Sequence, residues 1–190
     1  MRSEDLSRLV GGKCEESGGK FEFWPDIKKA ICGLDSTEGL PELIDFIRKI
    51  ELPDDMERFV FEVRASTSEG DLAYAITKSR EEKKIYHFVR ADAYNTEGLG
   101  SSFYRIMRTV GKSEENRLRE VLGRYGGLSR IKTKFGCDRK YESCGIIVMF
   151  DGEPYQIDPT IDREIIESAE KLWSATKNTE KVGKRTFIEI

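Results

Sequence analysis

The sequence predicts an α+β fold: a mostly antiparallel sheet, built from a three-stranded meander and a later hairpin, packed with several helices. Strand-like and helix-like segments are segregated along the chain, which favours this class over a wound parallel sheet. The chain has 190 residues, of which 38% are hydrophobic and 35% are charged, as is typical of one globular domain. We therefore expect a single domain over residues 1–190, with a helical N-terminal part (1–55) and a sheet-bearing part (56–190).

The N-terminal part is expected to form three short helices with glycine-rich connections. Ser3 can cap the first helix, and a Gly-Gly pair can end it. Pro25 suits the first turn of a second helix that ends at Gly33. Pro41 is expected to begin the third helix, because apolar residues follow it at helical spacing.

The meander is predicted over residues 58–90. Three segments, 59–64, 72–77 and 85–90, alternate between two sets of side chains with a period of two, and they are rich in β-branched and aromatic residues. Short polar or charged stretches join them, which favours antiparallel pairing.

After the meander, the sequence predicts two helices, followed by strands that include a hairpin. Apolar stripes at helical spacing predict two helices, and period-two patterns predict strands after them. Asp151-Gly152 is expected to form a tight hairpin turn. The predicted elements are helices over 99–110 and 114–124, strands over 129–135, 145–150 and 154–157, a helix from 158 to 173, and a strand over 185–190.

The histidine and cysteine content excludes several kinds of metal site. His87 is the single histidine, so zinc or iron sites with two or three histidines are excluded. The cysteine spacings match no zinc ribbon, and we expect four free thiols, at Cys14, Cys32, Cys137 and Cys144. The alternative is that Cys137 and Cys144 meet across a turn, as a disulfide or as two metal ligands. No catalytic residue and no metal ligand is assigned.

The strongest functional signal is a basic segment, residues 105–140, in an acidic chain. It contains eleven basic and four acidic residues, whereas the whole chain has a net charge of −3. Such a local excess indicates where an anion is attracted. The candidate nucleic-acid contacts are Arg105, Arg108, Arg117, Arg124, Arg130, Lys132, Lys134, Arg139 and Lys140.

The predicted strand at 129–135 makes this signal more specific. Arg130, Lys132 and Lys134 alternate with other residues and therefore share one face of the strand. Three cations in a row suit a phosphate backbone, and Tyr125, Phe135 and Tyr141 are candidates to stack on bases. The alternative is that an acidic block, residues 142–170, or a partner subunit neutralises the basic segment.

A second signal is the glycine-containing segment from Asn95 to Ser102, which follows a strand and opens a helix. Glycine amides and serine hydroxyls at a helix N-terminus can bind an anion. The segment resembles the pyrophosphate loop of GNAT-type acyltransferases, Q/R-x-x-G-x-G/A, since Gly98 and Gly100 match and Asn95 replaces Gln or Arg. The resemblance covers about residues 58–110 and departs from the family where a second helix is predicted instead of a strand. It implies an acyl-CoA cofactor held by Gly98, Gly100, Ser101 and Ser102.

Three functions follow from these signals. The first is a binding module for a phosphate-rich partner, nucleic acid above all, that uses the basic segment. The second is a small acyl-CoA-dependent transferase. The third is an assembly subunit, including a homo-oligomer, whose charge blocks contact other proteins. The longest apolar run, Ile146–Phe150, is too short to cross a membrane, and the N-terminus resembles no secretion signal, so we expect a cytoplasmic location.

Overall fold

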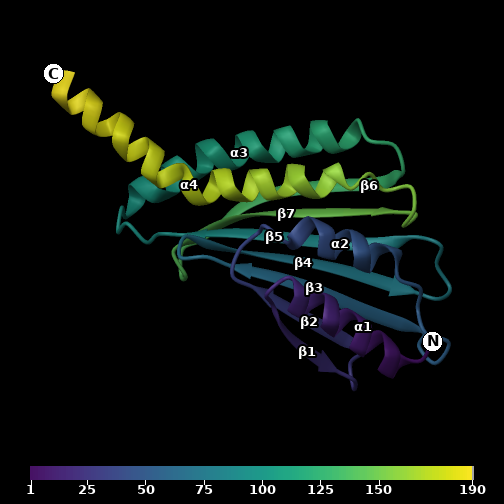
Figure 1. Ribbon diagram of the computed structural model, residues 1–190. Coiled ribbons are helices and arrows are strands. Elements are labelled where there is room, and N and C mark those ends of the chain that lie inside the picture. The colour runs from purple at the N-terminus through teal and green to yellow at the C-terminus, as the bar shows by residue number, and fades with distance from the viewer. Residues whose placement is uncertain (190) are drawn as a thin grey trace.

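Seven strands form one sheet in a computed structural model that describes the backbone of residues 1–189 and the side chains of residues 1–177 (Figure 1). The strands are β1 (Lys20–Trp24), β2 (Lys29–Leu34), β3 (Arg58–Ser66), β4 (Gly70–Ser79), β5 (Ile85–Tyr94), β6 (Leu128–Asp138) and β7 (Ser143–Gly152). The helices are α1 (Ser3–Glu16), α2 (Leu40–Lys49), α3 (Ser101–Gly123) and α4 (Thr160–Glu189). This arrangement confirms the predicted α+β class.

The strands are ordered β1-β2-β3-β4-β5-β7-β6 across the sheet. All neighbours pair antiparallel except β2 and β3, which are parallel because α2 connects them as a crossover. After β5 the chain crosses in α3 and returns as β6 at the edge of the sheet, and β7 then fills the place between β5 and β6. The predicted meander corresponds to β3, β4 and β5. The hairpin predicted at Asp151-Gly152 does not form, because these two residues end β7, and the hairpin of the structure is the β6–β7 pair, which turns at residues 139–142.

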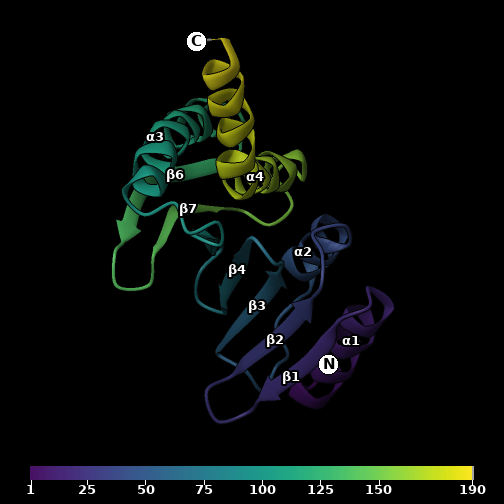
Figure 2. The same cartoon turned by 90° about the vertical axis from the view of Figure 1, so that its left-hand side faces the viewer.

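The helices cover one face of this sheet. Successive side chains of a strand point to opposite faces, and the buried ones, such as Phe61, Tyr74, Val89 and Val148, fall on one face across the central strands. Figure 2 shows α1 and α2 beside strands β1 to β4, with α3 and α4 over β6 and β7. Within the described residues, the opposite face has no helix against it, and we call it the open face.

The N-terminal part differs from the sequence prediction in two places. The first helix does not end at Gly11-Gly12, because α1 continues through both glycines to Glu16. The expected helix from Pro25 to Gly33 does not form, and the strands β1 and β2 occupy this region. The period of two in β2, where Ala30, Cys32 and Leu34 are buried and their neighbours are half-buried, explains the difference. Pairing with β1 on one side and β3 on the other outweighs the helical signal of the proline.

Three later elements also differ from the sequence prediction. The two helices expected over 99–124 form one continuous helix, α3, in which Gly111 allows close packing. A Cβ atom at Gly111 would lie 2.1 Å from the Phe135 ring, so this glycine serves helix–sheet contact rather than ending a helix. The strand expected at 154–157 is a turn region, and residues 185–189 continue α4 instead of forming a strand, while residue 190 lies outside the described residues.

All four cysteines are in disulfides, so the prediction of free thiols is wrong. Cys14 of α1 is bonded to Cys32 of β2 and ties the first helix to the sheet. Cys137 and Cys144 are directly opposite each other on β6 and β7, which is the bridge considered as the alternative. The first bridge was missed because its two cysteines lie on elements that only the β1–β2 pairing brings together. Among the described residues, no helix has the length and apolar character to cross a membrane.

Candidate functional site

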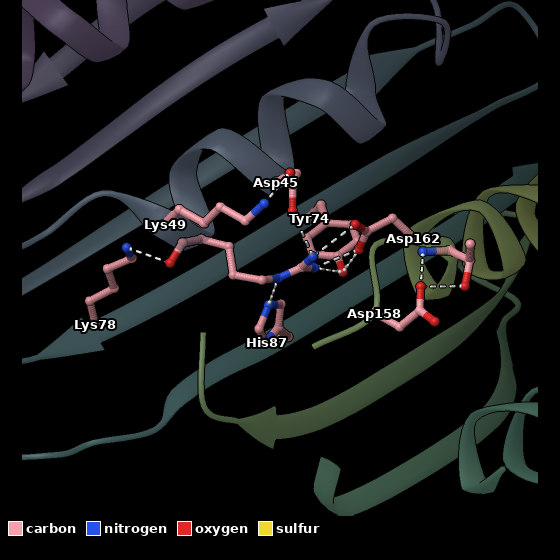
Figure 3. Close-up of polar contacts among 9 residues, drawn as sticks. Asp45, Lys49, Tyr74, Lys78, His87, Asp158 and Asp162 are labelled. Atoms are coloured by element: carbon pink, nitrogen blue, oxygen red, sulfur yellow. Dashed lines mark hydrogen bonds and ion pairs between the residues drawn. The ribbon is translucent and has the colours of Figure 1, made fainter. Parts of the chain in front are cut away.

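A buried ion pair lies between α2 and α4 on the helix-covered face. Arg48 of α2 donates two hydrogen bonds to the carboxylate of Asp162, with distances of 2.7 Å from Nη2 to Oδ1 and 3.1 Å from Nη1 to Oδ2. The Tyr74 hydroxyl of β4 donates to Asp162 Oδ1 at 2.5 Å. Figure 3 shows Tyr74, His87 and Asp162 gathered over the sheet. Arg48, Tyr74 and Asp162 each have an exposed fraction of 0%, so the charges are compensated entirely within the protein.

His87 of β5 completes this cluster as a neutral imidazole. Arg48 Nε donates to His87 Nε2 at 3.2 Å, which requires that Nε2 carries no proton. Burial, followed by the positive charges of Arg48 and Lys78, lowers the pKa of His87 well below its usual value. The imidazole stacks on the Phe150 ring with centroids 4.2 Å apart, and its Nδ1 atom has no hydrogen-bond partner among the described residues.

Lys78 of β4 lies beside this cluster and binds the end of α2. Its Nζ donates to the main-chain oxygen of Arg48 at 2.9 Å and also to that of Ile50. These carbonyls belong to the C-terminal turn of α2, where a helix lacks internal donors. Burial and the nearby guanidinium of Arg48 lower the pKa of Lys78 to about 7.

The arrangement of this cluster is suited to holding the helices on the sheet rather than to catalysis. Arg48, Tyr74 and Asp162 are inaccessible to solvent, so a substrate cannot reach them without movement of α2 or α4. The cluster joins two helices to two central strands through hydrogen bonds of defined direction. Its sequence separations are large, and we did not predict it from the sequence.

The open face contains a groove between β5 and β6. Its floor is β7, which pairs with both strands, and its walls are the side chains of β5 on one side and β6 on the other. One part has a volume of about 560 Å³, and the adjoining part has a volume of about 240 Å³. The residues that line this open-face groove include Tyr86, Phe88, Arg90 and Asp92 on β5, Asp151, Met149, Ile147 and Gly145 on β7, and Arg130, Lys132, Lys134, Gly136 and Asp138 on β6.

The β6 wall of the groove carries three positively charged side chains. Arg130, Lys132 and Lys134 are exposed, as the alternation predicted, and they have no ion-pair partner among the described residues. On the opposite wall Arg90 is paired with Asp92 at 2.8 Å. The net positive charge therefore lies along the β6 side of the groove.

The β5 wall presents two aromatic rings to solvent. Tyr86 is 42% exposed and Phe88 is 44% exposed, and they are two residues apart on one face of the strand. The register places Phe88 across Met149 from Lys132. Asp151 lies between Tyr86 and Arg130, is buried, and has an Oδ1 atom without a hydrogen-bond partner among the described residues.

Sequence reasoning missed the two aromatic residues of the groove. Of the rings proposed to stack on bases, Phe135 is buried against Gly111, Tyr125 is half-buried, and Tyr141 is exposed at the β6–β7 turn. The sequence signal that could have identified these two rings is the period-two alternation of residues 85–90. It sets Tyr86 and Phe88 on the face opposite to the buried residues of that strand.

The other predicted nucleic-acid contacts are not on the open face. Arg105, Arg108, Arg117 and Arg124 lie on or next to α3, which packs against the other face of the sheet. Arg117 binds Glu114, Glu164 and Ser168 between α3 and α4, and Arg124 pairs with Glu120.

Two more of the predicted contacts follow β6, in the turn that leads to β7. The Arg139 guanidinium lies over the Tyr104 ring, 4.4 Å from its centroid, and the Lys140 ammonium lies 5.4 Å from the Tyr141 centroid. Among the described ion pairs, Arg117–Glu164 is the one that joins the basic segment to residues 142–170. Internal neutralisation by the acidic block therefore involves Arg117 and leaves the β6 wall unpaired.

The backbone conformation of the loop from Asn95 to Ser102 explains why it contains glycines. Gly98 and Gly100 have φ values of 65° and 57°, a region that favours glycine, and α3 begins at Ser101. Asn95 Oδ1 accepts a hydrogen bond from the Leu99 amide at 3.0 Å, so the side chain aligned with the family's Gln or Arg holds the loop itself. Ser102, like Gly98, is exposed.

Comparisons with protein-family models, with curated proteins and with solved structures found no match for this chain. The functional argument therefore depends on the residues and geometry of the groove.

The Arg48–Asp162 pair yields a stability prediction. Replacement of Arg48 by Met should lower the free energy of unfolding by about 3–5 kcal/mol, because it leaves a buried carboxylate without its partner. The double variant Arg48→Met with Asp162→Leu should regain most of this loss, since no unpaired charge remains. Urea denaturation measures both, and Arg64→Met, which removes an exposed ion pair with Glu62, is the control with a loss below about 1 kcal/mol. Equal losses of free energy of unfolding for Arg48→Met and Arg64→Met would contradict the interpretation that Arg48 and Asp162 form a buried ion pair.

Lys78 yields a pH prediction. Its pKa is about 7 in the folded protein and about 10.4 in an unfolded chain, so between these values the unfolded state binds more protons. The free energy of unfolding therefore rises with pH across this window through Lys78, by at most about 1.4 kcal/mol per pH unit. The difference in free energy of unfolding between wild type and Lys78→Met should therefore rise from pH 7 to about 9. The corresponding difference for Lys83→Met, at an exposed lysine, should not change with pH. A difference for Lys78→Met that does not change with pH would contradict the lowered pKa of Lys78.

Proposed function

We propose that the protein is a binding module for nucleic acid and that the open-face groove is its binding surface. The observation that supports this is the row of three unpaired cations, Arg130, Lys132 and Lys134, opposite two exposed aromatic rings. Phosphate contacts supply most of the affinity of sequence-independent nucleic-acid binding. Aromatic rings add base stacking, which is tolerant of sequence.

The spacing of the cations supports the same function. Alternate residues of an extended strand are about 6.6–7 Å apart, so the three side chains form a regular line of positive charge. The strand is at the edge of the sheet, and the groove beside it is open to solvent. A partner can therefore approach without any rearrangement of the fold. Among the side chains that the structure describes, these cations make no ion pair, so their charge is available to a partner.

We restrict the proposed nucleic-acid contacts to part of the basic segment. Arg130, Lys132 and Lys134 form the centre of these contacts, and Arg139 and Lys140 lie in the turn beyond the same strand. Arg117 is engaged between two helices. Arg105 and Arg108 project from a helix on the other side of the sheet and serve as a comparison surface.

A cytoplasmic location remains part of the proposal, because it gives the groove access to nucleic acid. Disulfides are rare in cytosolic proteins, with the intracellular proteins of hyperthermophiles as the exception. The two bridges therefore indicate either such a source or an oxidising compartment.

The triple variant Arg130→Ala, Lys132→Ala, Lys134→Ala tests the proposed function. It should weaken binding to a fluorescent mixed-sequence single-stranded oligonucleotide by at least about tenfold, with a similar loss for other sequences. The slope of log affinity against log salt should flatten by about two, because each phosphate contact on a single strand contributes about −0.7. Fluorescence anisotropy over a salt series measures both quantities.

A matched control removes the same charge from the other face. Arg105→Ala, Arg108→Ala, Lys112→Ala should change affinity by less than about twofold, and all three proteins should have similar unfolding midpoints. Absence of binding by the wild type at low salt, or equal losses in the two triple variants, would contradict the proposal.

A further inference from the structure

The open-face groove has two unlike walls that suit the two unlike parts of a nucleotide. Lys132, Met149 and Phe88 are consecutive partners across the groove, so a cation and an aromatic ring face each other over the β7 floor. Because adjacent strands are about 4.7–4.9 Å apart, the two walls are separated by about 9–10 Å. This distance is comparable to the reach of a nucleotide from its phosphate to its base.

The aromatic wall requires bases with free faces. In a duplex each base is covered by its neighbours, and base faces become accessible in unpaired strands. Tyr86 and Phe88 are side by side on one face of β5 and expose nearly half of their surface, as stacking platforms must.

The charged wall fits a phosphate backbone that runs along β6. The cations repeat at about 6.6–7 Å, which is comparable with the distance between successive phosphates of a nucleic-acid strand, so the preference for a single strand comes from the aromatic wall. The three cations of β6 then correspond to three phosphates, which is a footprint of about four nucleotides.

The groove is less suited to an acidic peptide than to a nucleotide strand. Asp92 borders the groove but is ion-paired with Arg90, so the carboxylate that would repel an anionic chain is that of Asp151 on the β7 floor. A nucleotide strand keeps its charge at the β6 wall and lays neutral bases over the floor. The charge pattern across the groove is therefore complementary to a strand with one charged edge and one aromatic edge.

We propose that the groove binds single-stranded nucleic acid lying parallel to β7, with phosphates along Arg130, Lys132 and Lys134 and bases stacked on Tyr86 and Phe88. This inference rests on the proposed function and adds the strandedness, the orientation and the length of the bound segment. The rings determine the preference for a single strand, and the cations supply affinity for any phosphate backbone.

Three probes with the same backbone chemistry separate these contributions: a single-stranded thymidine octanucleotide, an abasic octanucleotide, and a duplex of equal length, which carries twice the number of phosphates but covers its base faces. The wild type should bind the thymidine strand at least about tenfold more tightly than the other two. In a length series of thymidine oligonucleotides, the gain in affinity per added nucleotide should fall after the fourth.

The substitution Phe88→Leu should weaken binding of the thymidine strand about tenfold, within the range measured for the loss of one stacking ring. It should leave the abasic strand unaffected. Phe88→Tyr should restore stacking, and Tyr141→Leu, at an exposed ring in the β6–β7 turn, should have no effect. Circular dichroism spectra confirm that each variant is folded.

The outcomes distinguish this inference from the proposed function. Equal affinity for all three probes, with a loss in the β6 triple variant, would overturn the single-strand inference and leave nucleic-acid binding in place. Binding of a poly-glutamate peptide with no binding of any oligonucleotide would overturn both. A preference for the thymidine strand that survives Phe88→Leu and Tyr86→Leu together would overturn the stacking assignment.

Discussion

The bidentate ion pair between Arg48 and Asp162 is the interaction on which the arrangement of this fold depends. It joins α2 to α4, elements that are far apart in the sequence, and it is anchored to the sheet through Tyr74 and His87. Burial of two charges is costly, and it is tolerated here because each charged group has directional partners. The pair fixes the position of α2 relative to α4, whereas the apolar cluster supplies the stability that holds the helices on the same face of the sheet and leaves the other face open.

The order of the strands then creates the groove. Since β7 lies between β5 and β6, two strands of different character become the walls of one surface. β5 is central and carries aromatic residues on its open face, whereas β6 is at the edge and carries cations. The β7 side chains become smaller from Met149 to Gly145, so the floor is lowest near Gly136 and Gly145, which are directly opposite each other. A charged edge and an aromatic edge in one groove are a consequence of topology rather than of any local motif.

Much of the fold could be predicted from local patterns in the sequence, but the groove could not. Period-two alternation was sufficient for the meander and for the shared face of Arg130, Lys132 and Lys134. The helix expected at Pro25 was wrong because strand pairing, a tertiary effect, outweighs a local helix signal. The Arg48–Asp162 pair spans 114 positions, and no spacing rule connects its members. Tyr86 and Phe88 became candidates only when the β5-β7-β6 order placed them opposite the cations.

The most direct test of the central claim, that the open face between β5 and β6 is the binding surface, is a chemical-shift titration of isotope-labelled protein with a thymidine tetranucleotide. The account predicts the largest shifts at the side chains of Phe88 and Met149 and at the amides of β6 and β7, with small changes on α3. Shifts concentrated at Arg105 and Arg108, or in the loop from Gly98 to Ser102, with an unperturbed groove, would contradict it.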